Sequence, residues 1–218
     1  MRRYDLVIFD FDGTLADSLT WFRTAMTEVI DRHGLKPLCE ERAEALRGMR
    51  PKEIMTELGI PAWKLPFIAA DVRARAAENV DKIHLFEGIA PALHELHASG
   101  VKLALVSSNG ETAVREVLGP ELSSLFSQFS CGAALFGKAS VFRKVMRKAH
   151  ATPDRTLSVG DETRDIEAAR EAGCDCAAVS WGFATRDALE REAADLLLDS
   201  PAMLGSLSAS QPVLARGA

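Results

Sequence analysis

The sequence predicts an α/β fold in which a parallel β-sheet is covered by helices on both faces and interrupted by an inserted all-α segment. Short apolar runs alternate with helical patterns over most of the chain, which is typical of right-handed crossovers between parallel strands. Residues 19–83 break this alternation, because their periodicity is only helical and is divided by glycines and prolines.

The strands are predicted from apolar runs that suit a strand buried on both faces. The clear runs are residues 6–9, 102–106, 156–159 and 177–180, and the weaker ones are 127–133 and 195–198. Helical periodicity predicts crossover helices at residues 111–118, 139–149, 165–172 and 186–194. The order of these segments predicts a sheet whose strands run in one direction.

The helical stretch divides the chain into two predicted domains. The sheet domain comprises residues 1–16 and 85–218, and the helical insertion comprises residues 17–84. We expect the insertion to end in a long helix over 64–81, and segments 13–18 and 83–91 to act as its hinges. The end of the chain, from about residue 206 to 218, lacks periodicity and is expected to fray.

The composition of the 218 residues is that of an ordinary globular protein, with 47% hydrophobic and 26% charged residues. A net charge of −5 without a basic block argues against a nucleic-acid partner. No apolar run approaches the roughly 18 residues needed to cross a bilayer, so we expect no membrane partner. The four cysteines lack zinc-site spacing, and no signal peptide precedes the first strand. We expect a reduced, cytoplasmic monomer or homodimer.

The most informative segment is DFDGTL at residues 10–15, which directly follows the first predicted strand. Gly13 and Thr14 break the strand, so Asp10 and Asp12 lie two residues apart at one chain turn. Two carboxylates at such a turn are costly to bury without a cation. We therefore expect positive charge to be held there.

Other predicted strands and loops also end in residues that can carry chemistry. They are Ser107, Ser108 and Asn109 after residues 102–106, Asp161 and then Asp165 after residues 156–159, and Lys138 in a loop before a helix. Ligands of open α/β sheets bind beyond the carboxyl ends of the strands, so these side chains are expected to converge.

Converging carboxylates favour a hard divalent cation such as Mg²⁺, which prefers oxygen ligands. A carboxylate beside such a cation can attack phosphorus and form an aspartyl phosphate, while a second carboxylate moves protons. A nearby hydroxyl and a lysine can hold the phosphoryl oxygens. The residue types therefore favour phosphoryl transfer.

Four motifs, in order along nearly the whole chain, resemble those of the haloacid dehalogenase-like superfamily. They are DFDGTL at 10–15, LALVSSN at 103–109, FGKAS at 136–140 and GDETRDIEAAREAG at 160–173. The resemblance implies a Rossmann-like sheet with a helical cap inserted after the first motif, which agrees with the insertion predicted above.

The resemblance implies a catalytic role for each matched residue. It makes Asp10 the nucleophile and Asp12 the general acid and base, and it makes Ser107 and Lys138 the groups that hold the phosphate. Ser108 and Asn109 are expected to bind substrate with them.

The resemblance also implies a Mg²⁺ site. Asp10, Asp161 and the backbone carbonyl of Asp12 are the expected ligands, and Asp165 orients the metal shell and Lys138. Glu162 stands where the family more often has a small residue or Asp, so the identity of the third carboxylate ligand stays open.

Within the superfamily, Asp12 favours phosphoryl transfer, because the dehalogenases lack a second aspartate there. The segments VSWGF at 179–183 and LRGMR at 46–50 resemble the phosphoglycolate-phosphatase-like branch. In the insertion, Arg47, Arg50 and Lys52 are candidates to hold the non-reacting end of an anionic substrate, and we expect Arg50 to do so.

The predicted function is a Mg²⁺-dependent phosphatase acting on a small phosphorylated metabolite, phosphoglycolate-like or a sugar phosphate. A phosphomutase, a phosphonatase with a lysine from the insertion, and a non-catalytic phosphate-binding module are the alternatives. Residues 132–138 also fit the P-loop pattern, but Ala139 stands where a hydroxyl should reach Mg²⁺. That alternative would leave Asp10 and Asp12 unexplained.

Overall fold

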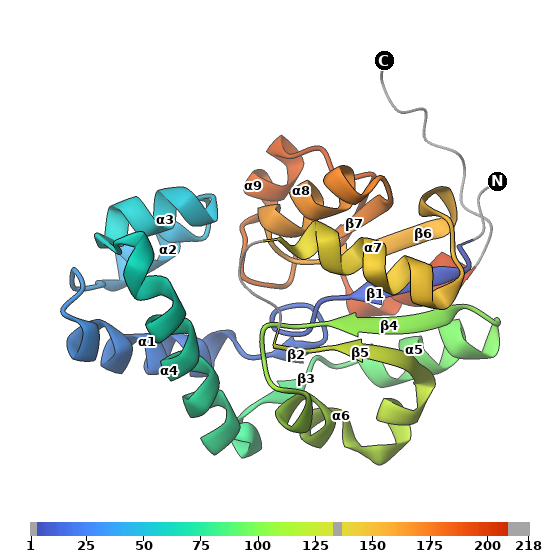
Figure 1. The fold of residues 1–218 in the computed structure, drawn as a ribbon, viewed down its shortest axis with the longest axis horizontal. Helices are drawn as coiled ribbons and strands as arrows, with labels where there is room; N and C mark the ends of the chain where they lie inside the picture. The colour runs from blue at the N-terminus through green and yellow to red at the C-terminus, as the bar shows by residue number, and fades with distance from the viewer. Residues whose placement is uncertain (1–3, 133–136, 209–218) are drawn as a thin grey trace.

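The computed structural model describes residues 4–132 and 137–208. Within them, parallel strands form one sheet in the order β5-β4-β1-β6-β7-β8 (Figure 1). Their bounds are β1 (Leu6–Phe9), β4 (Lys102–Val106), β5 (Phe126–Ser130), β6 (Thr156–Gly160), β7 (Asp175–Val179) and β8 (Leu196–Leu198). The predicted α/β class with a parallel sheet is confirmed.

Helices cover both faces of this sheet (Figure 1). They are α5 (Ile89–Ala98), α6 (Glu111–Leu125) and the 3-10 helix η4 (Pro201–Ser208) on one face, and α7 (Lys138–Ala149), α8 (Thr163–Ala172) and α9 (Arg186–Arg191) on the other. The strands are apolar at every position because successive side chains point to opposite faces of the sheet, and helices cover both faces. Val7 and Phe9 of β1 pack with α5 and α6, whereas Leu6 and Ile8 pack with α7 and α8.

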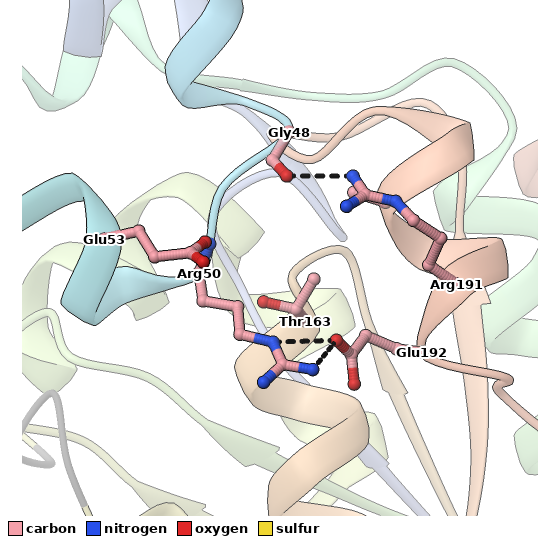
Figure 2. Close-up of a pocket in the computed structure, with 7 residues that line it drawn as sticks. Gly48, Arg50, Glu53, Thr163, Arg191 and Glu192 are labelled. Atoms are coloured by element: carbon pink, nitrogen blue, oxygen red, sulfur yellow. Dashed lines mark hydrogen bonds and ion pairs between the residues drawn. The ribbon is translucent and has the colours of Figure 1, made fainter.

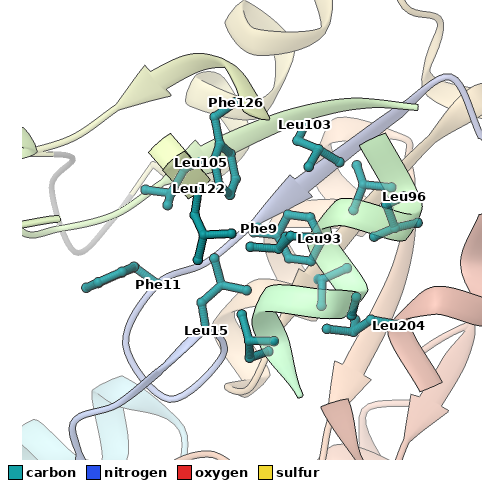
Figure 3. Packing of buried hydrophobic residues seen from close by; sticks show 14 of the residues in the cluster. Phe9, Phe11, Leu15, Leu93, Leu96, Leu103, Leu105, Leu122, Phe126 and Leu204 are labelled. Carbon is teal, nitrogen blue, oxygen red and sulfur yellow. The ribbon is translucent and has the colours of Figure 1, made fainter. Parts of the chain in front are cut away.

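Phe9 anchors the end of β1 in the larger core (Figure 3). Its fully buried ring packs edge-on against Phe126, with ring centroids 6.3 Å apart, among leucines of α5 and β4. Burial of one such side chain stabilises the fold by about 1.5–3 kcal/mol. The residue that follows, Asp10, is therefore held by a rigid strand.

The chain enters the helical insertion after β2 (Ala16–Asp17) and returns to the sheet domain at β3 (His84–Leu85). Its helices are α1 (Leu19–His33), α2 (Glu40–Leu46), α3 (Pro51–Leu58) and α4 (Leu65–Glu78), with short 3-10 turns η1 (Ala62–Lys64) and η2 (Val80–Lys82) on either side of α4. They lie to the left of the sheet in Figure 1. Met26, Val29 and Ile30 of α1 pack on Ile68 of α4 in a separate small core.

The two predicted hinges contain β2 and β3, which pair with each other as an antiparallel ladder. Ala16 lies opposite Leu85, and Asp17 lies opposite His84. The second hinge is shorter than the sequence indicated, because α5 already begins at Ile89.

Several predicted boundaries were wrong by a few residues. Helix α6 continues past Gly119 and Pro120 to Leu125, because Gly119 adopts a φ of 73° and a ψ of 167° and joins two helical segments across a kink. Strand β7 begins at Asp175 instead of 177, and α9 ends at Arg191 instead of 194.

At two places the predictions reach residues that the structure does not describe. Strand β5 ends at Ser130, and residue 133 of the predicted strand lies outside the described part. Of the segment predicted to fray, residues 206–208 belong to η4, and residues 209–218 again lie outside the described part. Among the described helices, none combines the length and apolar character required to span a membrane.

Candidate active site

The candidate site lies beyond the carboxyl ends of three neighbouring strands, β4, β1 and β6. Ser107 follows β4, Asp10 follows β1 and Asp161 follows β6, so the sheet order brings these side chains to one edge. Lys138 begins α7, and Asp165 lies in the first turn of α8. The convergence expected at the strand ends is thus observed for these five residues.

Lys138 links two of the carboxylates. Its Nζ lies 2.8 Å from Oδ2 of Asp10 and donates to Oδ1 of Asp165 at 2.6 Å. Burial works to lower the pKa of Lys138, but the charges of Asp10 and Asp165 outweigh it and raise that pKa. The lysine therefore remains a fixed positive charge between them.

Asp10 is buried and is held through both carboxylate oxygens. Oδ1 accepts a hydrogen bond of 2.8 Å from the backbone N–H of Phe11, and Oδ2 faces Lys138. Burial raises the pKa of Asp10, and the charge of Lys138 offsets part of that rise. This orientation suits attack on an electrophile brought to the strand end.

Asp12 has different surroundings from Asp10. Its Oδ2 accepts a hydrogen bond of 2.8 Å from the side-chain amide of Asn109. Burial raises the pKa of Asp12 to about 6, and the charge of Asp10 adds to the rise. A carboxyl group that titrates near neutral pH can both give and take a proton.

Gly13 forms the tight turn between Asp12 and Thr14. It adopts a φ of 71°, in the left-handed region that favours glycine. A Cβ atom at Gly13 would lie 2.1 Å from Oδ2 of Asp161. The turn therefore passes so close to Asp161 that no larger residue fits without rearrangement.

Both carboxylate oxygens of Asp161 accept hydrogen bonds. The hydroxyl of Thr14 donates to Oδ1 at 2.8 Å, and the backbone N–H of Phe183 donates to Oδ2 at 2.8 Å. Burial raises the pKa of Asp161 well above its usual range, and the charges of Glu162 and Asp165 raise it further. Accumulated negative charge of this kind favours a bound cation.

Glu162 and Arg164 complete the charged cluster, and sequence reasoning missed Arg164. The two side chains form an ion pair and are half-buried. Glu162 also lies beside Asp10 and Asp165, and these three offer ligand oxygens within 4.8 Å of one another. A basic residue in the first turn of a helix, where the dipole disfavours it, was the signal available in the sequence.

Three of the predicted residues lie in the turn that follows β4. Ser107 and Asn109 are buried in the turn after β4, where the backbone N–H of Asn109 donates to Oγ of Ser107 at 3.0 Å, and Ser108 between them is half-buried. The P-loop pattern considered above spans residues 132–138. The structure describes Gly137 and Lys138 of this segment, but its interior, residues 133–136, lies outside the described part.

Arg50 belongs to the insertion and crosses to the sheet domain (Figure 2). Its Nε and Nη2 donate to Oε1 of Glu192 at 2.9 and 2.5 Å. Arg191 also crosses this boundary, because its Nη2 donates to the carbonyl of Gly48 at 3.0 Å. These residues line a pocket of about 250 Å³ that also reaches Thr163 at the start of α8.

Residues 7–179 match the family of haloacid dehalogenase-like hydrolases. This chain belongs to that family. The haloacid dehalogenase-like chain is 32% identical to a phosphoglycolate phosphatase of Synechococcus elongatus over 199 residues, which cover 91% of this chain and 94% of that protein. It is 27% identical to the tyrosine-protein kinase PtkA of Mycobacterium tuberculosis over 85% of its length, but spans only 65% of that protein.

A solved structure of CbbY from Rhodobacter sphaeroides in complex with phosphate is similar to this haloacid dehalogenase-like chain. The two chains share 25% identity and a TM-score of 0.72, over 93% of this chain and 96% of the other. The predictions of this superfamily, and of a phosphatase within it, are confirmed.

Proposed function

We propose that this phosphatase uses Mg²⁺ to hydrolyse a small phosphorylated metabolite through an aspartyl phosphate on Asp10. The observation that carries the proposal is the position of Lys138, which lies within 2.8 Å of Asp10 and is fixed on its other side by Asp165. A cation held beside the nucleophile can neutralise the phosphoryl oxygens as they approach, together with the hydroxyl of Ser107.

In the first step, a carboxylate oxygen of Asp10 forms a bond to phosphorus and the bond from phosphorus to the ester oxygen breaks. Asp12, protonated, gives its proton to the departing oxygen. In the second step, Asp12 takes a proton from a water, whose oxygen attacks phosphorus and releases inorganic phosphate and the Asp10 carboxylate. The pKa of about 6 for Asp12 supports both transfers near neutral pH.

The charge balance of the cluster supports a divalent cation. Carboxylates outnumber cations in this cluster, which contains Asp10, Asp12, Asp161, Glu162 and Asp165 with Lys138 and Arg164. The oxygens of Asp10, Glu162 and Asp165 within 4.8 Å of one another also fit a hard ion. When bound, Mg²⁺ stabilises charge on the transferring phosphoryl group.

In this proposal Asp10, Asp161 and the backbone carbonyl of Asp12 would hold the Mg²⁺ ion. Asp165 orients the site through Lys138, and Glu162 is a further candidate ligand because its carboxylate lies beside Asp10.

The helical insertion, residues 17–84, is proposed to act as a cap that selects the substrate. The relative from Synechococcus elongatus is named as acting on phosphoglycolate, an anion with a carboxylate at its non-reacting end. Arg50 of the insertion is the proposed partner for such a group. A cytoplasmic location is also part of the proposal, and it rests on the sequence, whose four cysteines lack zinc-site spacing.

The test is phosphate release from 2-phosphoglycolate, sugar phosphates, nucleotides and a phosphonate, each with Mg²⁺ and with EDTA. We expect release from at least one ester that requires Mg²⁺ and falls by about 10³-fold or more in Asp10→Asn. Asp154→Asn is the matched control, because Asp154 is exposed before β6, at the opposite end of that strand from Asp161. Full activity of Asp10→Asn, or turnover of the phosphonate alone, would contradict the proposal.

A further inference from the structure

The backbone of Phe183 is hydrogen-bonded on both sides, through its N–H to the site and through its carbonyl to the insertion. Its N–H donates to Oδ2 of Asp161 at 2.8 Å, and its carbonyl accepts from Nε of Arg47 at 2.7 Å. Arg47 follows α2 directly, so a residue of the insertion reaches the segment that orients Asp161.

The segment at residues 182–183 packs directly against Asp161. A Cβ atom at Gly182 would lie 2.3 Å from Cβ of Asp161 and 2.4 Å from the carbonyl oxygen of Gly13. The backbone is therefore in direct contact with Asp161. Any shift of this segment changes the hydrogen bond that Asp161 accepts from Phe183.

The insertion holds this segment at several points. Nη2 of Arg47 lies 3.3 Å from the carbonyl oxygen of Gly182, and the carbonyl of Arg47 accepts from the N–H of Thr185 at 3.1 Å. Phe22 of α1 also packs edge-on against Phe183, with centroids 5.3 Å apart. Glu44 fixes Nη1 of Arg47 at 2.7 Å, so the guanidinium is oriented before it reaches the segment.

We propose that Arg47 is a positioning residue of the phosphatase site: from the insertion, it fixes the backbone of residues 182–183 and thereby the orientation of Asp161. The inference rests on the proposed function, in which Asp161 is a metal ligand. Groups that orient a ligand from behind usually change metal affinity by about 10- to 100-fold when removed. Arg47 acts one residue farther away, so we expect a smaller effect.

Other contacts cross the same boundary without reaching Asp161, and they provide the control. Arg191 bonds to the carbonyl of Gly48, and it starts from α9, not from residues 182–183 (Figure 2). Loss of Arg191 loosens the insertion at a nearby point but leaves the bonds of Phe183 in place. Arg47→Gln and Arg191→Gln therefore separate orientation of Asp161 from general attachment of the insertion.

The first measurement is the affinity of each metal-free variant for Mg²⁺ alone, by calorimetric titration. We expect about 5-fold weaker binding by Arg47→Gln and unchanged binding by Arg191→Gln. In steady-state assays, kcat of Arg47→Gln should fall while the KM for the ester changes little. Thermal unfolding identifies a variant that has lost its fold. Arg47→Lys keeps a positive charge and one donor nitrogen, so it should recover part of the Mg²⁺ affinity.

The second measurement does not depend on the metal or on activity. Hydrogen exchange of the Phe183 amide should be faster in Arg47→Gln and unchanged in Arg191→Gln. Unchanged exchange in Arg47→Gln, or equal acceleration in both variants, would overturn the inference. A wild-type protein that binds no Mg²⁺ and releases no phosphate would instead refute the proposed function, and the exchange experiment would still decide whether Arg47 holds Phe183.

Discussion

Asn109 donates a hydrogen bond of 2.8 Å from its side-chain amide to Oδ2 of Asp12. Its backbone N–H donates at the same time to Oγ of Ser107. Asn109 therefore connects the residue that follows β4 with the carboxylate that follows β1. The sequence predicted that Asn109 binds substrate. Its contact with Asp12 suggests a second role, which is to orient this proposed general acid and base.

Replacement of Asn109 by Ala should lower kcat by about 10-fold, because Asp12 loses the hydrogen bond from the Asn109 amide that positions it as an acid. The KM for the ester should change less. Steady-state kinetics test this, with Asn79→Ala in the insertion as the control. A change confined to KM would show that Asn109 acts on the substrate and not on Asp12.

Replacement of Lys138 by Met should both abolish activity and destabilise the metal-free protein by about 3 kcal/mol. The buried carboxylates of Asp10 and Asp165 would then face each other without the cation between them. Urea unfolding in EDTA measures the loss, and Lys144→Met, on the exposed side of the same helix, is the control. Equal stability of the two variants would mean that Lys138 contributes nothing to the charge balance.

Replacement of Glu192 by Gln should lower the KM for a phosphate ester with a second anionic group by up to about 5-fold. Glu192 occupies the guanidinium of Arg50, so an anionic substrate must compete with it. An ester with a neutral end should show no change. Arg50→Gln should raise the KM of the anionic ester alone, and identical effects on both esters would exclude Arg50 from substrate selection.

Asp71 should make the stability of the insertion depend on pH. Burial works to raise the pKa of Asp71, but hydrogen bonds from Arg75 and His33 and the charge of Arg32 outweigh it and hold that pKa below its ordinary value. A carboxylate with a depressed folded pKa stabilises the protein above the unfolded pKa, about 3.9, and loses this effect as pH falls through the folded value.

Asp71→Asn should therefore lower the melting temperature at pH 7 and at pH 5, and the difference from wild type should shrink below about pH 4. Thermal unfolding across this range measures it. Asp31→Asn on the exposed side of α1 is the control. A difference that grows as the solution becomes more acidic would have the wrong sign for a depressed pKa.

The strands of the sheet were predictable because they are buried on both faces and read as apolar runs. Strand β7 shows where this signal ends. Asp175 looks like a loop residue, yet it lies in the strand and is buried, since its carboxylate accepts a hydrogen bond of 3.0 Å from Tyr4. That partner is 171 positions away. Only the tertiary structure shows that the charge is accommodated.

The positions of candidate site residues were predictable where a polar side chain directly follows a strand, as for Asp10, Ser107 and Asp161. Hydrogen bonds made by backbone atoms could not be predicted from the sequence in this way. The N–H of Phe183 and the carbonyl accepting from Arg47 belong to a residue whose side chain predicts only packing. Arg164 was missed for a different reason, because nothing in the sequence indicates that its side chain pairs with Glu162 within the charged cluster.

The ladder between β2 and β3 changes what movement of the insertion can mean. Ala16 and Asp17 leave the sheet domain hydrogen-bonded to Leu85 and His84, which return to it. The two connections therefore form a single ribbon, so any movement of the insertion would have to displace both of them together. Since this ribbon starts four residues after Asp12, such a movement would also act on the turn that carries the proposed proton donor.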